Sequence, residues 1–122
     1  MEIYDKSGNV IASSVPPESR NFDNMTIRNA WMVDLELEGM SFSRSDLSRW
    51  ECTGSDLYGS ILIETNMSQC KIQGVANLAG ADFSGSKYDA ATIFLEGFDP
   101  VQKGMIKLED WEREHRPQAA NS

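Results

Sequence analysis

The sequence predicts an all-β solenoid whose coils are roughly square, and three observations lead to that prediction. Apolar side chains recur every five residues from Phe22 to Ile93, with a single one-residue slip. Small side chains stand two places before most of these apolar positions. Glycines and aromatic residues also repeat after twenty residues, as Gly39 and Gly59 do. Together these patterns indicate stacked coils that place like residues above one another.

A period of five fits neither of the ordinary elements. On an α-helix each step of five advances about 140°, and on a flat strand each step reaches the opposite face. A chain that buries one side chain every five residues must instead turn a corner at that interval, and four corners close a square. The fifteen apolar positions are Phe22, Ile27, Met32, Leu37, Phe42, Leu47, Cys52, Leu57, Leu62, Met67, Ile72, Leu78, Phe83, Tyr88 and Ile93.

The small residues before these positions are expected to point inward where space is tight. Trp50 is a large exception, and it precedes Cys52, the smallest of the apolar series, so volume is expected to be compensated within that repeat. The ten small residues are Ala30, Ser45, Ser55, Ser60, Thr65, Cys70, Ala76, Ala81, Ser86 and Ala91.

Residues 1–19 are expected to form an N-terminal hairpin cap. Residues 2–5 and 10–13 flank a turn in which Gly8 and Asn9 can adopt positive φ. An isolated hairpin is marginally stable in water, so this one is expected to dock on the solenoid. Open solenoid ends also recruit other strands, which favours a cap.

Residues 20–94 are expected to form the repeat, and residues 95–122 a short C-terminal helical cap with a frayed tail from 117 to 122, all within one domain. Asp99 and Pro100 could begin a helix, and Leu108 and Trp111 stand one helical turn apart. The one-residue slip, around Gly74 and Val75, predicts a bulge or a corner loop.

Three units carry a resemblance to a known family. They resemble the alanine-aspartate/asparagine-leucine-x-x unit of the pentapeptide repeat proteins, and the likeness extends over about residues 20–94. Leu95 stands where the exit from such repeats often has proline. The resemblance implies a right-handed quadrilateral β-helix, and it implies functions that include blocking bacterial gyrase. The three units are Ser55-Asp56-Leu57-Tyr58-Gly59, Ala76-Asn77-Leu78-Ala79-Gly80 and Ala81-Asp82-Phe83-Ser84-Gly85.

The composition limits the partners and the compartment. A net charge of −8 and a pI near 4.5 disfavour direct contact with nucleic acid or with an anionic membrane, and favour a basic partner. No leader pattern and no apolar run of membrane-spanning length occurs, which predicts a cytoplasmic protein of a bacterium, or of a phage acting inside one. Cys52 and Cys70 are expected to be buried and reduced.

The sequence offers no catalytic constellation, so we expect a non-enzymatic protein without cofactor or metal. His115 lies in a charged segment beside Glu114 and Arg116, where a solvated role is expected. Neither cysteine has a histidine nearby at metal-ligand spacing. Glycines occur singly at corners and form no phosphate-binding loop.

Folding the repeats onto four sides predicts an acidic stripe. Glu36, Glu38 and Asp56 flank the inward residues of one side, and Asp34 lies at the adjoining corner without a compensating cation. Neighbouring sides add three carboxylates that arginines and a lysine dilute: Asp46, Glu51 and Glu64. Such a stripe is either an ordinary solvated face or a copy of the DNA phosphates, which carry one charge per about 1.7 Å.

A second candidate surface is apolar. Ile61 and Ile63 flank an inward leucine and should face outward, and Trp31 and Phe94 are expected to face outward on another side. Exposed apolar residues of this kind mark interfaces or lie under a cap.

The leading functional hypothesis is a DNA-mimic inhibitor that occupies the basic DNA-binding cleft of a bacterial protein or complex. Nearly four coils at about 4.8 Å each give a shaft of about 19 Å, which spans five or six base pairs. That length favours a target that reads a short site, such as a defence complex blocked by an anti-CRISPR protein. Gyrase or another topoisomerase would require a homodimer joined end to end. The alternative is an interaction scaffold, or a toxin-immunity or adaptor protein, that binds through its apolar face and responds little to salt.

Overall fold

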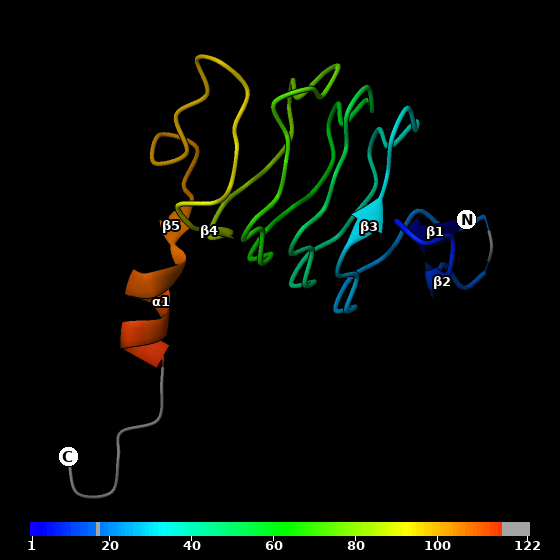
Figure 1. Cartoon of the computed structure of the whole chain (residues 1–122), viewed down its shortest axis with the longest axis horizontal. Coiled ribbons are helices and arrows are strands. Elements are labelled where there is room, and N and C mark those ends of the chain that lie inside the picture. The colour runs from blue at the N-terminus through cyan, green and yellow to red at the C-terminus, as the bar shows by residue number, and fades with distance from the viewer. Residues whose placement is uncertain (17, 116–122) are drawn as a thin grey trace, which may run out of the picture.

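The computed structural model describes residues 1–16 and 18–115, and in it the chain winds into a β-helix solenoid (Figure 1). Eleven isolated parallel bridges join residues that are 20, 21 or 22 positions apart, from Asn21↔Ser41 to Lys71↔Ile93. Coils therefore stack on one another with like positions in register, as the twenty-residue repeat predicted.

Each coil has four sides, which we number by the residues that pair from coil to coil. Side 1 carries Asn21, Ser41, Ile61 and Asp82; side 2 carries Thr26, Asp46, Asn66 and Lys87; side 3 carries Trp31, Glu51, Lys71 and Ile93; side 4 carries Glu36, Asp56 and Asn77.

The corners follow from the residues at two positions. Asp or Asn at the pairing position accepts a hydrogen bond from the backbone N–H two residues later, as Tyr58 N–H donates to Asp56 Oδ1 at 2.9 Å. The corner residue then adopts positive φ, as Gly59 does at 65° and Glu64 at 57°. Glycine adopts this conformation without steric cost, and the side-chain turn stabilises it where another residue stands.

The interior is a column of apolar side chains, and small polar side chains also point inward along it. Phe22, Phe42 and Trp50 are fully buried, with ring centroids 5.7 Å apart for Phe22 and Phe42 and 5.8 Å apart for Phe42 and Trp50. Ser45 lies between coils, and its hydroxyl donates to the Phe22 carbonyl at 2.6 Å. Cys52 and Trp50 are both completely buried, which agrees with the expected volume compensation.

Serine 60 is the exception among these inward hydroxyls, because its Oγ is buried without a hydrogen-bond partner among the described residues. We therefore expect Ser60→Ala to leave the free energy of unfolding unchanged or to increase it slightly. Ser45→Ala should lower it by about 1–3 kcal/mol, because the Phe22 carbonyl and the Met25 N–H lose their partner. Urea denaturation of both variants tests this, and equal losses would contradict it.

The first slip is a β-bulge. Ala76 N–H donates to the Ser55 carbonyl at 2.9 Å, while the Asn77 carbonyl accepts from Leu57 N–H at 2.8 Å, so Ala76 and Asn77 together stand opposite Asp56. The predicted inward place of Ala76 is wrong: Ala76 is exposed, and Val75 is buried in its stead. The bulge keeps Val75 in the phase of the earlier coils.

A second slip, which the pattern of apolar residues did not predict, lies between Tyr88 and Thr92. Lys71 pairs with Ile93 at a separation of 22, and Ile93 is 45% exposed while Thr92 is buried. The predictions that Ile93 and Ala91 point inward and that Phe94 points outward are therefore wrong. Phe94 is half-buried and its ring lies 5.5 Å from that of Tyr88.

At the N-terminal end, β1 (Glu2–Asp5) pairs antiparallel with β2 (Val10–Ser13) and, on its other edge, with β3 (Ala30–Trp31). Ile3 is 1% exposed and belongs to the core cluster. The hairpin thus adds an apolar side chain to the end of the column, because β1 pairs with the first coil (Figure 1).

At the C-terminal end, β4 (Lys87–Tyr88) pairs parallel with β5 (Ile106–Lys107), and α1 (Leu108–His115) follows directly. Asp99 and Pro100 begin a turn rather than the expected helix. Lys87 Nζ lies 5.0 Å from the centroid of the Trp111 ring, which links α1 to side 2. In the described part of the chain, no helix is long and apolar enough to cross a membrane. The expected frayed tail lies outside the described residues.

Candidate protein-binding surfaces

Of the seven carboxylates in the predicted acidic stripe, four lie together on side 4 and its corner. Glu36 and Asp56 pair on adjacent coils, Glu38 follows on the same side, and Asp34 occupies the corner with φ of 56°. Among residues 1–16 and 18–115, no ion pair neutralises any of the four. We call Asp34, Glu36, Glu38 and Asp56 the side-4 acidic group.

One cation lies close to this group, although the sequence predicted no compensating lysine or arginine there. The Arg20 guanidinium donates to the backbone carbonyl of Glu38, with Nε 3.1 Å from the oxygen. Arg20 precedes the first coil in sequence, and it lies beside Glu38 because the first coil returns to its starting side at residues 38–41. The side-4 acidic group is therefore bordered by the Arg20 guanidinium at Glu38.

The other three predicted carboxylates do not extend the group. Asp46 accepts from Arg28 Nε at 2.6 Å on side 2, and Glu51 lies 3.6 Å from Lys6 Nζ on side 3. Glu64 stands at a corner, where its backbone carbonyl accepts from Lys87 Nζ at 2.8 Å. The fold thus distributes these residues over separate sides and gives two of them a cationic partner.

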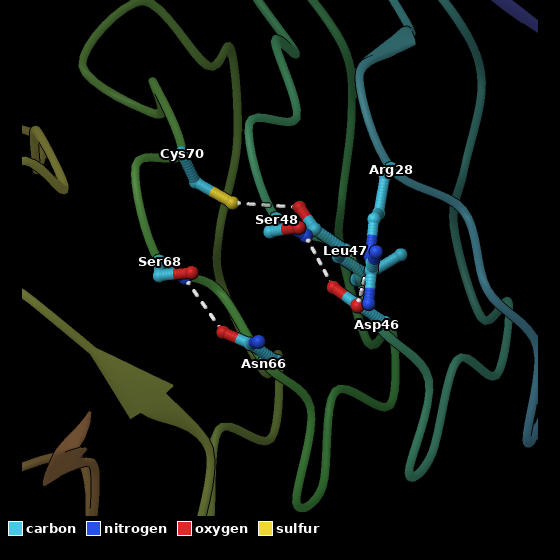
Figure 2. A network of polar contacts seen from close by, with 7 residues as sticks. All are labelled: Arg28, Asp46, Leu47, Ser48, Asn66, Ser68 and Cys70. Atoms are coloured by element: carbon cyan, nitrogen blue, oxygen red, sulfur yellow. Dashed lines mark hydrogen bonds and ion pairs between the residues drawn. The ribbon is translucent and has the colours of Figure 1, made fainter.

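Several aspartates accept hydrogen bonds from backbone N–H groups in addition to carrying surface charge. Figure 2 shows Asp46 accepting from Arg28 and from the Ser48 N–H, and Asn66 on the next coil accepting from the Ser68 N–H in the same way. The sequence held a signal for this role, since asparagine replaces aspartate at equivalent positions such as Asn66. What repeats is the side-chain acceptor, and the charge is secondary.

The pKa of Asp46 reflects both of its contacts. Burial raises this pKa, but the hydrogen bonds from Arg28 and from Ser48 outweigh burial and hold it below the ordinary value of 3.8. An acid whose pKa is lowered by folding contributes stability above its unfolded pKa, and that stability is lost as the pH falls through the folded value.

We expect Asp46→Asn to keep the turn to Ser48 and to lose only the ion pair with Arg28. At neutral pH the variant should lose at most about 1 kcal/mol, because the Arg28 side chain is largely in water. The difference from the wild type should shrink as the pH falls below 3.8. Urea denaturation across that pH range measures it, and a difference that stays constant would contradict the assignment.

The predicted apolar surface divides into two unlike parts. Ile61 is 36% exposed and Ile63 is half-buried, but the residues paired with Ile61 on side 1 are Ser41 and Asp82, so no apolar patch forms there. Trp31 is 47% exposed and stands directly opposite Tyr4, which is 43% exposed, in the β1–β3 pair. The exposed aromatic pair therefore lies at the N-terminal end.

This pair borders a hollow of about 430 Å³ whose lining includes Val33 and Leu35. Sequence reasoning found Trp31 but missed Tyr4, because Tyr4 belongs to the hairpin and reaches Trp31 only through strand pairing. The two cysteines offer no surface chemistry. Both are buried and free, and burial raises the pKa of Cys52 to about 12.

These features define a class of protein: a β-helix solenoid of stacked four-sided coils, with a hairpin paired to its first coil. The sequence profile described as pentapeptide repeats matches residues 51–87 in eight copies. The coil-to-coil pairing extends from Asn21 to Ile93, interrupted by the two slips. Residues 51–87 of the chain are therefore pentapeptide repeats.

Among solved structures, the chain is similar to alr5209, a pentapeptide repeat protein from Nostoc PCC 7120, at 23% identity. The match covers 70% of this chain and 83% of that one, with a TM-score of 0.33. No curated protein matches the chain. The likeness to pentapeptide repeat proteins rests on the repeat profile of residues 51–87, and the stacking of the coils agrees with it.

Proposed function

We propose that this protein is a non-enzymatic inhibitor that inserts its side-4 acidic group into the DNA-binding cleft of a bacterial protein or complex. The observation that supports the proposal is the stacking of Glu36 on Asp56 with no cationic partner among the described residues. Asp34 and Glu38 flank Glu36 on the first of these two coils.

The density of charge supports phosphate mimicry over a short length. Four carboxylates on two coils of about 4.8 Å each amount to one charge per about 2.4 Å, compared with about 1.7 Å for duplex DNA. Two coils correspond to about three base pairs at 3.4 Å per pair. The favoured target therefore reads a short DNA site, as the CRISPR complexes blocked by anti-CRISPR proteins do. Gyrase, which holds a longer segment, would need two copies joined end to end.

The double role of Asp56 decides how the proposal is tested. Its Oδ1 accepts the Tyr58 N–H, so a lysine at this position would break a corner as well as remove a charge. Asparagine keeps the acceptor and removes only the charge. The informative variant is therefore the triple replacement Glu36→Gln, Glu38→Gln and Asp56→Asn.

The experiment measures displacement of a fluorescent duplex from gyrase and from CRISPR effector complexes at low and at high salt. The wild type should displace DNA at low salt and weaken steeply as salt rises. The triple variant should lose at least tenfold in potency. The matched control replaces Glu109, Glu112 and Glu114 of α1 with glutamine, which removes the same number of charges far from side 4. Equal potency of the two triple variants would overturn the proposal.

The second candidate is an interaction scaffold or an immunity or adaptor protein, and the exposed Tyr4–Trp31 pair favours it. Trp31→Gln should then abolish binding of the partner, and added salt should change that binding little. The two candidates are separated by which variant affects binding.

A further inference from the structure

On sides 4 and 1, the last coil has backbone donors that no described residue pairs with. In the coil before it, three N–H groups donate to carbonyls of the next coil: Leu57 to Asn77 at 2.8 Å, Gly59 to Ala79 at 2.9 Å and Leu62 to Asp82 at 2.7 Å. The corresponding groups of the last coil have no hydrogen-bond partner among the described residues. They are the N–H groups of Leu78, Gly80 and Phe83.

The open edge also offers an acceptor. Asp82 N–H donates to the Ser60 carbonyl at 2.9 Å, and the equivalent carbonyl one coil later, that of Ala81, accepts no bond in the described part of the chain. A sheet edge with unpaired donors and acceptors is a template for an added strand. The spacing of these groups repeats that of the coil before, so the template has a defined register.

Side 2 shows what closure of such an edge looks like in this protein. There, Gly85 N–H donates to the Gly104 carbonyl at 2.9 Å, and Ile106 N–H donates to the Ser86 carbonyl at 2.8 Å. The pairing of β4 with β5 thus supplies the next strand on side 2 (Figure 1). No comparable segment among the described residues pairs with residues 78–83.

A hollow of about 630 Å³ lies beside the open edge. Leu78 and Phe83 of the last coil and Leu95 and Phe98 of the following loop supply apolar lining, and the Phe83 and Phe98 rings meet edge to face at 5.3 Å. The charged residues of the lining are Asp82, Glu96 and Lys103, a net charge of −1. The hollow therefore combines apolar contact, free backbone donors and a slight negative charge.

We propose that this open edge binds an extended, basic segment of a partner protein, which adds as a further strand over sides 4 and 1. Carbonyl groups of the segment accept from Leu78, Gly80 and Phe83, and these bonds provide affinity that is independent of sequence. An apolar side chain of the segment contacts the apolar lining, and its basic side chains face Asp82 and Glu96. This surface lies at the end of the solenoid and goes beyond the proposed use of side 4.

A peptide derived from the protein itself is a suitable probe. Residues 55–64 pair with the opposite edge of the last coil, so their backbone already has the register that stacks on residues 76–84. The probe is the capped peptide of residues 55–64 with Ile61, Ile63 and Glu64 replaced by lysine, which keeps Leu57 and Leu62 as inward residues. A control peptide replaces both leucines with serine as well.

The measurement is amide hydrogen exchange of the full chain by NMR, with and without the probe peptide. Exchange at Leu78, Gly80 and Phe83 should slow at least tenfold at saturation, and the control peptide should bind at least tenfold more weakly. Glu96→Lys should weaken the probe at least threefold, whereas Glu112→Lys, an equal change of charge on α1, should not.

Three results would overturn the proposal. The first is unchanged exchange at the three amides when the probe is present at millimolar concentration. The second is protection in the free protein that increases with protein concentration, because the occupant would then be a second copy. The third is protection in the free protein at every concentration, because the chain itself would then cover the edge. Since the probe assay uses no DNA-binding target, its failure is distinguishable from failure of the DNA-competition assay.

Discussion

Phe42→Ala is expected to lower the free energy of unfolding by about 3–5 kcal/mol. The Phe42 side chain is fully buried, and its ring lies between those of Phe22 and Trp50, at 5.7 and 5.8 Å. Its removal leaves a cavity that the coils above and below cannot fill, because their spacing is set by backbone hydrogen bonds.

Urea denaturation monitored by tryptophan fluorescence measures this loss. Tyr58→Ala is the matched control, because Tyr58 is also aromatic but is 56% exposed, and it should change stability by no more than about 0.5 kcal/mol. A loss below about 1 kcal/mol for Phe42→Ala would mean that the coils collapse around the missing ring.

Asp89→Ala is expected to lower the free energy of unfolding by about 2–3 kcal/mol. Asp89 stands in the second slip, where the extra residue displaces the carbonyl that the Gln69 N–H would otherwise meet. Its Oδ1 replaces that carbonyl, at 3.1 Å from Gln69 N, and also accepts from Ala91 N–H at 3.0 Å and from the Thr92 hydroxyl at 3.2 Å.

Asp89→Asn is the control, because it keeps an acceptor oxygen in the same place. It should retain more than half of the stability that alanine loses. Hydrogen exchange at Gln69 supplies a local readout and should quicken in the alanine variant alone. If both variants lose equally, the charge of Asp89 matters more than its role as an acceptor.

The sites illustrate how far local sequence can identify function in a repeat protein. The five-residue period predicted that Glu36 and Asp56 lie on one side, because each lies next to an inward leucine. The period could not predict which carboxylates form ion pairs with a described lysine or arginine. Arg28 reaches Asp46, and Lys6 reaches Glu51, only across coils or from the hairpin.

The sequence by itself determined the period, the solenoid and the inward apolar residues from Phe22 to Ile72, because burial selects the same positions in every group of five residues. Only the tertiary structure decided the phase after Tyr88. Ile93 and Phe94 are adjacent and both apolar, so a one-residue slip leaves the pattern of hydrophobicity almost unchanged. Pairing of Ile93 with Lys71 makes the choice, since hydrogen bonds to the preceding coil require register that composition does not encode.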